Sequence, residues 1–163
     1  MHMKRAYYIF TFFLIGCSSN VKDKSGAIDS LKQHDMAMKS FQQYTITDTI
    51  TVDLNGDSIP DLAYFKTNIN KNTIVVRDGK TTKEVSIGLD KSFKDIGNNF
   101  NWVDNWGTTN DREVYENVIR NEEIIGGKKV RLTNKSLFVG KDDEEGGIIT
   151  FREGRFLWVH QAD

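Results

Sequence analysis

Short segments rich in β-branched and aromatic residues recur along most of this chain, separated by clusters of Asn, Asp, Gly and Lys. Such segments favour strands, and the polar clusters favour turns. The predicted strands are Thr45–Val52, Asp61–Thr67, Thr73–Arg77, Lys83–Ile87, Asn99–Val103, Glu113–Arg120, Lys128–Leu132, Ser136–Val139, Ile148–Arg152 and Arg155–Val159. Hairpins on this regular scale predict an all-β fold, with a single antiparallel β-sandwich or barrel-like domain.

The beginning of the chain has the layout of a secretory signal. Lys4 and Arg5 form a basic region, and the apolar stretch Ala6–Ile15 follows them. A membrane-spanning helix needs about 20 apolar residues, so this stretch is too short to span a bilayer. We therefore predict a signal peptide over residues 1–16.

Cys17 is the only cysteine in the chain, so it cannot close a disulfide within the chain. The run Leu14-Ile-Gly-Cys17 resembles the lipobox of bacterial lipoproteins, in which the sulfur of the cysteine carries a lipid. Ser18, rather than Asp, follows the cysteine, and the resemblance then implies the outer membrane, with the domain on its periplasmic or cell-surface face. The alternative for Cys17 is a buried free cysteine.

Residues 17–43 are predicted to be a lipid-anchored tether and arm, and residues 44–163 the all-β domain. The segment Ser18–Ser30 is rich in Ser, Lys, Asp and Gly, which is typical of a flexible tether. Rough helical spacing relates Ile28, Leu31, Met38 and Phe41. One short N-terminal helix or an extended arm is expected there.

The most specific motif is a short acidic loop between two predicted strands. Oxygen-bearing side chains occupy its positions 1, 3, 5 and 9, namely Asp53, Asn55, Asp57 and Asp61. Alternate side chains of a tightly wound loop turn toward a hard cation, and Ile59 at position 7 can add its backbone carbonyl. The loop therefore predicts a Ca²⁺ site. The alternative is an Asx-turn that closes a hairpin without metal.

This loop differs from an EF-hand, because strands flank it and Tyr64 stands where a bidentate Glu is needed. The run DLNGDSIPDL instead resembles the DxDGDGxxDL loop of FG-GAP and VCBS-type extracellular β proteins. Asn55 replaces one carboxylate of that pattern, and Ser58 replaces a glycine at a sharp turn. Both changes are expected to weaken calcium binding.

Charge and residue types exclude several functions. Removal of Lys4 and Arg5 with the signal leaves 20 of the 22 basic residues against 23 acidic ones, a net charge of −3. Nucleic acid is not a predicted partner, because phosphate binding needs a concentrated cationic face. The mature chain holds only His34 and His160 and has no nucleophile or zinc motif. An enzyme is therefore not predicted.

Two tryptophans, Trp102 and Trp106, lie close together in an asparagine-rich segment. They are candidates for a partner surface that contacts a protein or stacks on a sugar. Large aromatic residues of small β domains more often pack in the core or anchor hairpins. The sequence leaves all three roles open.

The C-terminal segment Gly146–Gln161 resembles the closing hairpin of small periplasmic or lipid-anchored proteins with one VCBS-like calcium loop. These are similar to I-type lysozyme inhibitors and to immunity proteins against peptidoglycan hydrolases. The resemblance implies a monomer, held at the membrane only by its lipid, that binds and inhibits a cell-wall hydrolase by occluding its cleft. The alternative is a cell-surface glycan-binding or adhesive module.

Overall fold

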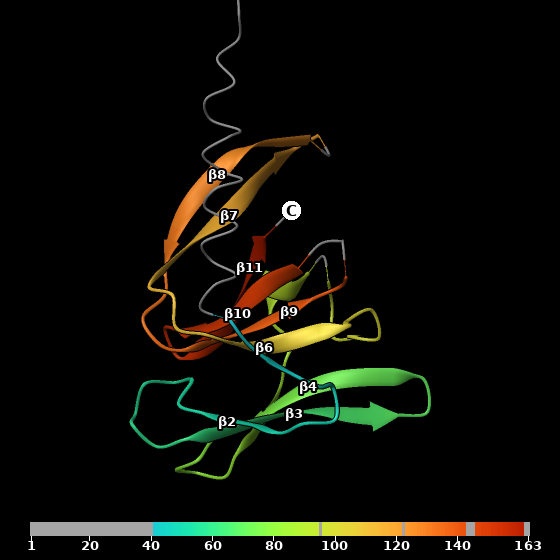
Figure 1. The fold of residues 1–163 in the computed structure, drawn as a ribbon, viewed down its shortest axis with the longest axis vertical. Coiled ribbons are helices and arrows are strands. Elements are labelled where there is room, and N and C mark those ends of the chain that lie inside the picture. The colour runs from blue at the N-terminus through green and yellow to red at the C-terminus, as the bar shows by residue number, and fades with distance from the viewer. Residues whose placement is uncertain (1–40, 95, 122, 143–145, 162–163) are drawn as a thin grey trace, which may run out of the picture.

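The computed structural model describes residues 41–94, 96–121, 123–142 and 146–161. These residues form three antiparallel sheets and no α-helix (Figure 1). The predicted all-β class is confirmed, and the sheets are open layers, as in a sandwich, rather than a closed barrel. The predicted signal peptide, Cys17 and most of the tether, with its possible helix, lie outside the described residues.

The central layer is a five-stranded sheet (Figure 1). Its strands, in spatial order, are β1 (Gln42–Tyr44), β6 (Asn105–Thr109), β9 (Ser136–Gly140), β10 (Gly146–Arg152) and β11 (Arg155–Gln161). The last two form the predicted C-terminal hairpin, in register from Gly146 opposite Gln161 to Arg152 opposite Arg155. The end of the predicted arm is thus an edge strand, because β1 pairs with β6.

A four-stranded sheet packs against one face of the central layer (Figure 1). Its strands are β2 (Ile50–Val52), β3 (Asp61–Asn68), β4 (Lys71–Arg77) and β5 (Glu84–Ser86). The predicted strand Thr45–Val52 is therefore wrong in its first half. A turn occupies that half, in which the amide of Thr45 donates to Asp48 Oδ2 at 2.8 Å. This turn carries the chain from the central sheet into the four-stranded sheet.

The main hydrophobic core lies between these two sheets. Trp106 is its largest fully buried side chain, with 0% exposure. Its ring packs edge-to-face on Phe65 with centroids 4.7 Å apart, and its Nε1 donates to the carbonyl of Thr45 at 2.7 Å. Trp106, a residue of β6, thus contacts both sheets and the turn that joins them.

The predicted strand Asn99–Val103 is wrong, because this segment is a loop docked on β4. The amide of Phe100 donates to the carbonyl of Asn72 at 2.8 Å, and the amide of Asn72 donates to Asn101 Oδ1 at 2.6 Å. Asn101 Nδ2 also donates to the carbonyl of Asn70 at 3.0 Å. The side chain of Asn101 thus supplies backbone partners that a strand ladder would otherwise provide. The strand itself begins later, at Asn105.

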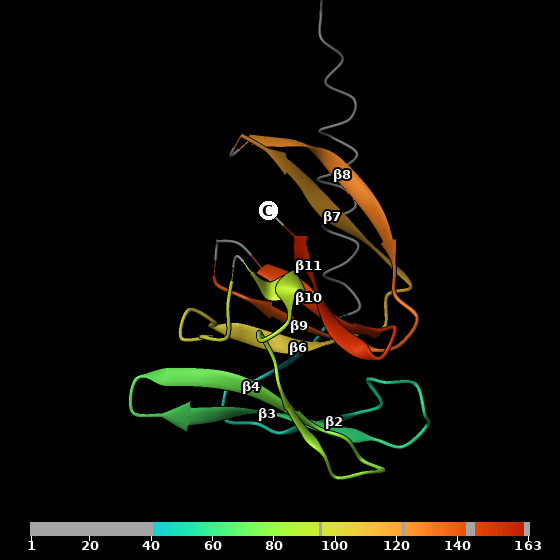
Figure 2. The same ribbon diagram turned by 180° about the vertical axis from the view of Figure 1, so that it is seen from behind.

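A two-stranded ribbon forms the third layer, on the other side of the central sheet (Figures 1 and 2). It consists of β7 (Glu113–Arg120) and β8 (Glu123–Arg131), and their register shifts between Val118 and Ile119, where Ile125 is the extra residue of a bulge on β8. Its base packs through Val114 onto a second cluster that includes Ile148 and Val159 of the central sheet. Its far end extends beyond this cluster, so the ribbon projects from the sandwich.

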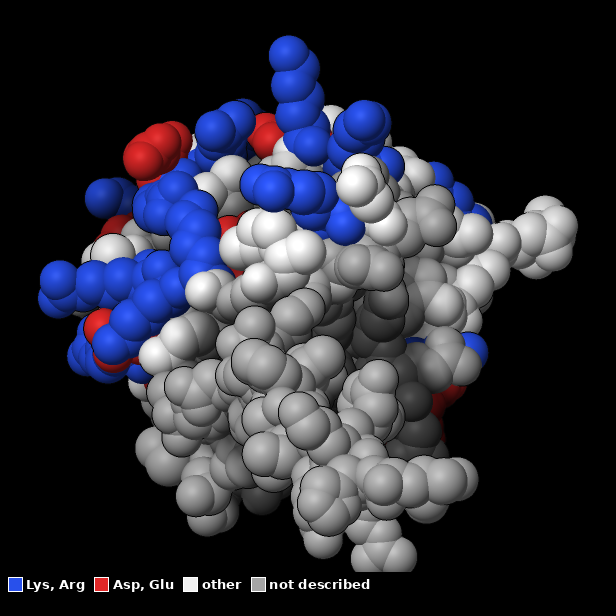
Figure 3. Space-filling view, turned by 90° about the horizontal axis from the view of Figure 1, so that it is seen from above, with Lys and Arg blue, Asp and Glu red and all other residues white. Residues whose placement is uncertain are grey.

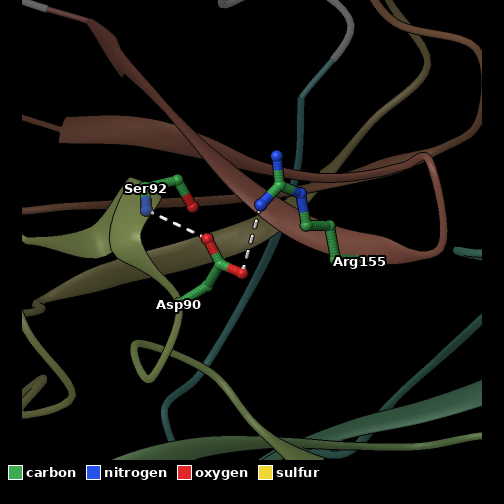
Figure 4. Close-up of polar contacts among 3 residues, drawn as sticks. All are labelled: Asp90, Ser92 and Arg155. Carbon is green, nitrogen blue, oxygen red and sulfur yellow. Dashed lines mark hydrogen bonds and ion pairs between the residues drawn. The ribbon is translucent and has the colours of Figure 1, made fainter.

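A short 3-10 helix, η2 (Lys91–Phe93), joins the four-stranded sheet to β6 and contacts β11. Asp90 caps it by accepting from the amide of Ser92 at 3.1 Å, and Arg155 Nη1 lies 3.6 Å from Asp90 Oδ2 (Figure 4). The Ser92 amide, followed by the nearby Arg155 charge, holds the pKa of Asp90 below its ordinary value. Phe93 is thereby placed in the core.

Candidate functional site

The acidic loop is wound by its own side chains. Asp53 accepts from the amides three and five residues later, at 2.7 and 2.9 Å. Asn55 and Asp57 each accept from the amide two residues later, at 2.8 and 2.9 Å. Gly56 and Ser58 have φ values of 83° and 68°, the left-handed region. Ser58 therefore occupies a backbone conformation that favours glycine, as its place in the DxDGDGxxDL pattern predicts.

Asp61, the fourth carboxylate or amide side chain of the predicted ligand set, has a different environment. It is 1% exposed, whereas Asp57 is exposed. One oxygen of Asp61 accepts from the amide of Leu54 at 3.0 Å, and the other accepts from the amide of Gly79 at 2.9 Å. The side chain thus clamps both ends of the loop to a neighbouring turn.

That neighbouring turn adds an acidic residue that the sequence analysis missed. Asn55 Nδ2 donates to Asp78 Oδ2 at 3.0 Å, across 23 residues of chain. The backbone and side-chain hydrogen bonds from Thr81 are the largest causes that lower the pKa of Asp78. A Cβ at Gly79 would lie 2.0 Å from the carbonyl oxygen of Pro60, so only glycine permits this close approach. The Asp78-Gly79 pair signals a turn in the sequence, but not its partner.

These contacts bear on the predicted calcium site. In the part of the chain described, no group of three or more His, Cys, Asp or Glu side chains is arranged to hold a metal ion. The carboxylates of Asp53, Asp57 and Asp61 instead accept amide hydrogens, which is the geometry of the Asx-turn alternative. Each carboxylate oxygen has a second lone pair for a cation. Calcium binding at this loop therefore stays a prediction.

The two predicted surface tryptophans are not equivalent. Trp106 is buried in the core, so its ring cannot contact a partner in this structure, and the packing role applies to it. Trp102 is half-buried and lies beside Trp158, with ring centroids 6.5 Å apart and planes at 88°. The ring of Trp158 in turn covers Gly147. The aromatic pair at the surface is thus Trp102 with Trp158, rather than Trp102 with Trp106.

The projecting ribbon carries a second candidate surface that the sequence analysis missed. Of the large hydrophobic residues that are exposed in the described part of the chain, five lie on the ribbon, namely Tyr115, Val118, Ile119, Ile124 and Ile125. Ile119 and Ile124 face each other across the strands and are 52% and 55% exposed. Tyr115 shares their face, because side chains alternate along β7. Apolar residues this exposed are typical of an interaction surface rather than of a solvated hairpin.

Charged residues border these apolar side chains. Lys and Arg side chains gather at the end of the molecule where the ribbon lies (Figure 3). Lys128 lies 3.5 Å from Glu116, and Lys129 lies 2.5 Å from Glu113. The Glu113 hydrogen bond raises the pKa of Lys129 above its ordinary value. Lysines and a bulge on β8 disfavour the addition of another strand to its edge, which leaves the face of the ribbon for contact.

In the described part of the chain, no helix has the length and apolar character needed to cross a membrane. Comparisons with protein-family models, with curated protein sequences and with solved structures found no match.

Proposed function

We propose that this protein is a lipid-anchored envelope protein that binds and inhibits a peptidoglycan hydrolase and carries one Ca²⁺. The observation that supports binding is the projecting ribbon with its exposed apolar side chains. Tyr115, Ile119 and Ile124 expose apolar surface on one face of the ribbon, and apolar side chains gathered on one face favour contact with a protein partner.

Occlusion of a cleft is consistent with the shape of the ribbon. It rests on the central sheet only through its base, where Val114 and Leu132 are buried. The far half, with Ile119 and Ile124, is two strands wide, with about 5 Å between the two backbones. A hairpin of this kind can enter a substrate cleft, and its apolar side chains would bury surface on entry.

The Cys17 lipid is the proposed anchor, at the outer membrane. Cys17→Ser is expected to leave the chain soluble or unprocessed, which membrane fractionation measures. A Cys17→Ser chain that still partitions into the membrane as a processed lipoprotein would contradict the anchor.

Calcium is proposed to stabilise the loop. The proposed ligands are Asp53, Asn55, Asp57, Asp61 and the carbonyl of Ile59. The loop carries three carboxylates, those of Asp53, Asp57 and Asp61, within nine residues, and a bound cation would offset the repulsion between them. An affinity of about 10⁻⁴ to 10⁻³ M, usual for extracellular modules, would give about 0.4 to 1.4 kcal/mol at millimolar calcium. Isothermal titration with Ca²⁺, and melting with and without chelator, test this.

Binding is tested with residues 18–163, which contain every described residue. This protein is screened against muramidases and amidases for complex formation and loss of peptidoglycan hydrolysis. The double variant Ile119→Ser, Ile124→Ser should lose binding. Ile69→Ser is the matched control, because Ile69 is 98% exposed at the turn between β3 and β4, far along the chain from the ribbon. No binding to any hydrolase would contradict the proposal.

A glycan-binding module is the second candidate. The half-buried pair Trp102 and Trp158 favours it, because exposed parts of aromatic rings stack on sugars. Asn101, beside Trp102, uses both its amide oxygen and its amide nitrogen to hold the loop at the start of β4, however, so these two groups are engaged away from a sugar. Retardation in gels containing polysaccharide, lost in Trp102→Ala, would support the glycan function.

A further inference from the structure

Asn55 and Gly56 form the only Asn-Gly pair in the chain, and they lie in the acidic loop. In such a pair the backbone nitrogen of the glycine can attack Cγ of the asparagine side chain. The amide proton leaves with the side-chain nitrogen as ammonia, and a five-membered succinimide forms. Water then opens the ring to aspartate or isoaspartate. Glycine permits this reaction because no Cβ hinders the approach of its nitrogen.

The structure holds both reacting groups away from this reaction. The Gly56 N–H donates to Asp53 Oδ1 at 2.7 Å, so the nucleophile is engaged. The negative charge of Asp53 also disfavours the ionised nitrogen that attacks. Asn55 Oδ1 accepts from the amide of Asp57 at 2.8 Å, and Asn55 Nδ2 donates to Asp78 Oδ2 at 3.0 Å. Attack requires the Asn55 side chain to leave both partners.

We propose that Asn55 is the site at which this chain deamidates, and that the carboxylates of Asp53 and Asp78 set the rate by keeping the loop closed. The reaction replaces an amide that donates to Asp78 with a carboxylate that repels it. Deamidation therefore loosens the contact between the loop and the turn after β4. If the proposed calcium site exists, the same reaction adds a carboxylate to its ligands.

The test follows deamidation of residues 18–163 at neutral pH by peptide mapping and mass spectrometry, which separates Asn, Asp and isoaspartate at position 55. The same protein in urea gives the rate of the open loop. Asp53→Ala and Asp78→Ala each remove one restraint. Asp48→Ala is the control, because it removes a carboxylate that accepts from an amide, that of Thr45, in a different turn. Circular dichroism checks that each variant is folded.

We expect deamidation at Asn55 to be several-fold slower in the folded protein than in urea. Asp53→Ala should raise the folded rate several-fold, Asp78→Ala should raise it less, and Asp48→Ala should leave it unchanged. Should Asp53→Ala fail to fold, Asp53→Asn keeps an acceptor without the charge and should raise the rate modestly. Equal rates in the folded protein and in urea, or another asparagine reacting first in urea, would overturn the proposal.

These outcomes are separate from calcium binding, because every rate is measured in chelator. A second series at millimolar Ca²⁺ asks whether the cation slows the reaction further. Slowing by Ca²⁺ would link deamidation to the proposed metal site. An unchanged rate would count against calcium at this loop and leave the deamidation site intact.

Discussion

Replacement of Asp61 separates a structural role in the acidic loop from a metal-binding one. Its carboxylate is buried and accepts from the amides of Leu54 and Gly79. Asp61→Ala leaves both amides without their acceptor. Asp57→Ala is the matched change, because it removes another predicted calcium ligand that is exposed and accepts from a single amide.

The expected loss of stability follows from the surroundings of the two amides. Leu54 is 1% exposed, so its amide stays unsatisfied in the variant, at about 1–3 kcal/mol. Gly79 lies in an exposed turn where water can replace the carboxylate, and its loss is about 0.5–1.5 kcal/mol. Asp61→Ala should therefore destabilise the fold by about 1.5–4.5 kcal/mol, against less than about 1 kcal/mol for Asp57→Ala.

Urea unfolding in chelator measures both variants without any metal contribution. The reasoning fails if Asp61→Ala is as mild as Asp57→Ala under these conditions, because Asp61 would then not act as a clamp. Repetition at millimolar calcium distinguishes the second role. Asp57→Ala should abolish any stabilisation by calcium, whereas Asp61→Ala should stay destabilised with or without it.

Three further changes test the packing and the electrostatics. Gly147→Ala places a Cβ 2.3 Å from the indole of Trp158 and should lower the free energy of unfolding by about 1–3 kcal/mol, measured in urea. Trp106→Phe removes a partly buried hydrogen bond and leaves a cavity, so a loss of about 2–3 kcal/mol in the free energy of unfolding is expected in thermal melts. Arg155→Ala should raise the pKa of Asp90 in an NMR titration. Folding lowers the pKa of Asp90, so its contribution to stability is present above its unfolded pKa and is lost as pH falls through its folded pKa. In Arg155→Ala this loss of stability should occur at a higher pH.

The sequence located most strands because alternation and turn residues are local signals. The bounds of β7, Glu113–Arg120, match the prediction, and β3 differs from it by one residue. The prediction failed at Asn99–Val103, where apolar and polar residues also alternate. There the side chain of Asn101 binds the backbone of Asn70 and Asn72, at the start of β4, about 30 residues away, and no local pattern reveals that partner.

The acidic loop also has features that the sequence predicts and features that only the tertiary structure reveals. Asp53, Asn55 and Asp57 are neighbours in the chain, so their spacing alone predicts a tightly wound loop, and the structure shows one. Only the tertiary structure reveals that Asp61 is buried as a clamp and that Asp78 joins the loop. Both depend on the pairing of β3 with β4, which brings the loop and the turn together.

By itself, the sequence determined the all-β class, most of the strands and the acidic turn, because each of these depends on residues that are close together in the chain. Tertiary structure decided which sheet each strand joins, that Trp106 is in the core and that Ile119 and Ile124 are exposed. Whether a side chain is buried depends on which element packs against its strand. The same alternation of apolar residues therefore occurs in a strand that faces the core and in a ribbon that projects from it. The far half of the ribbon extends past the central sheet, and that placement makes its isoleucines a surface.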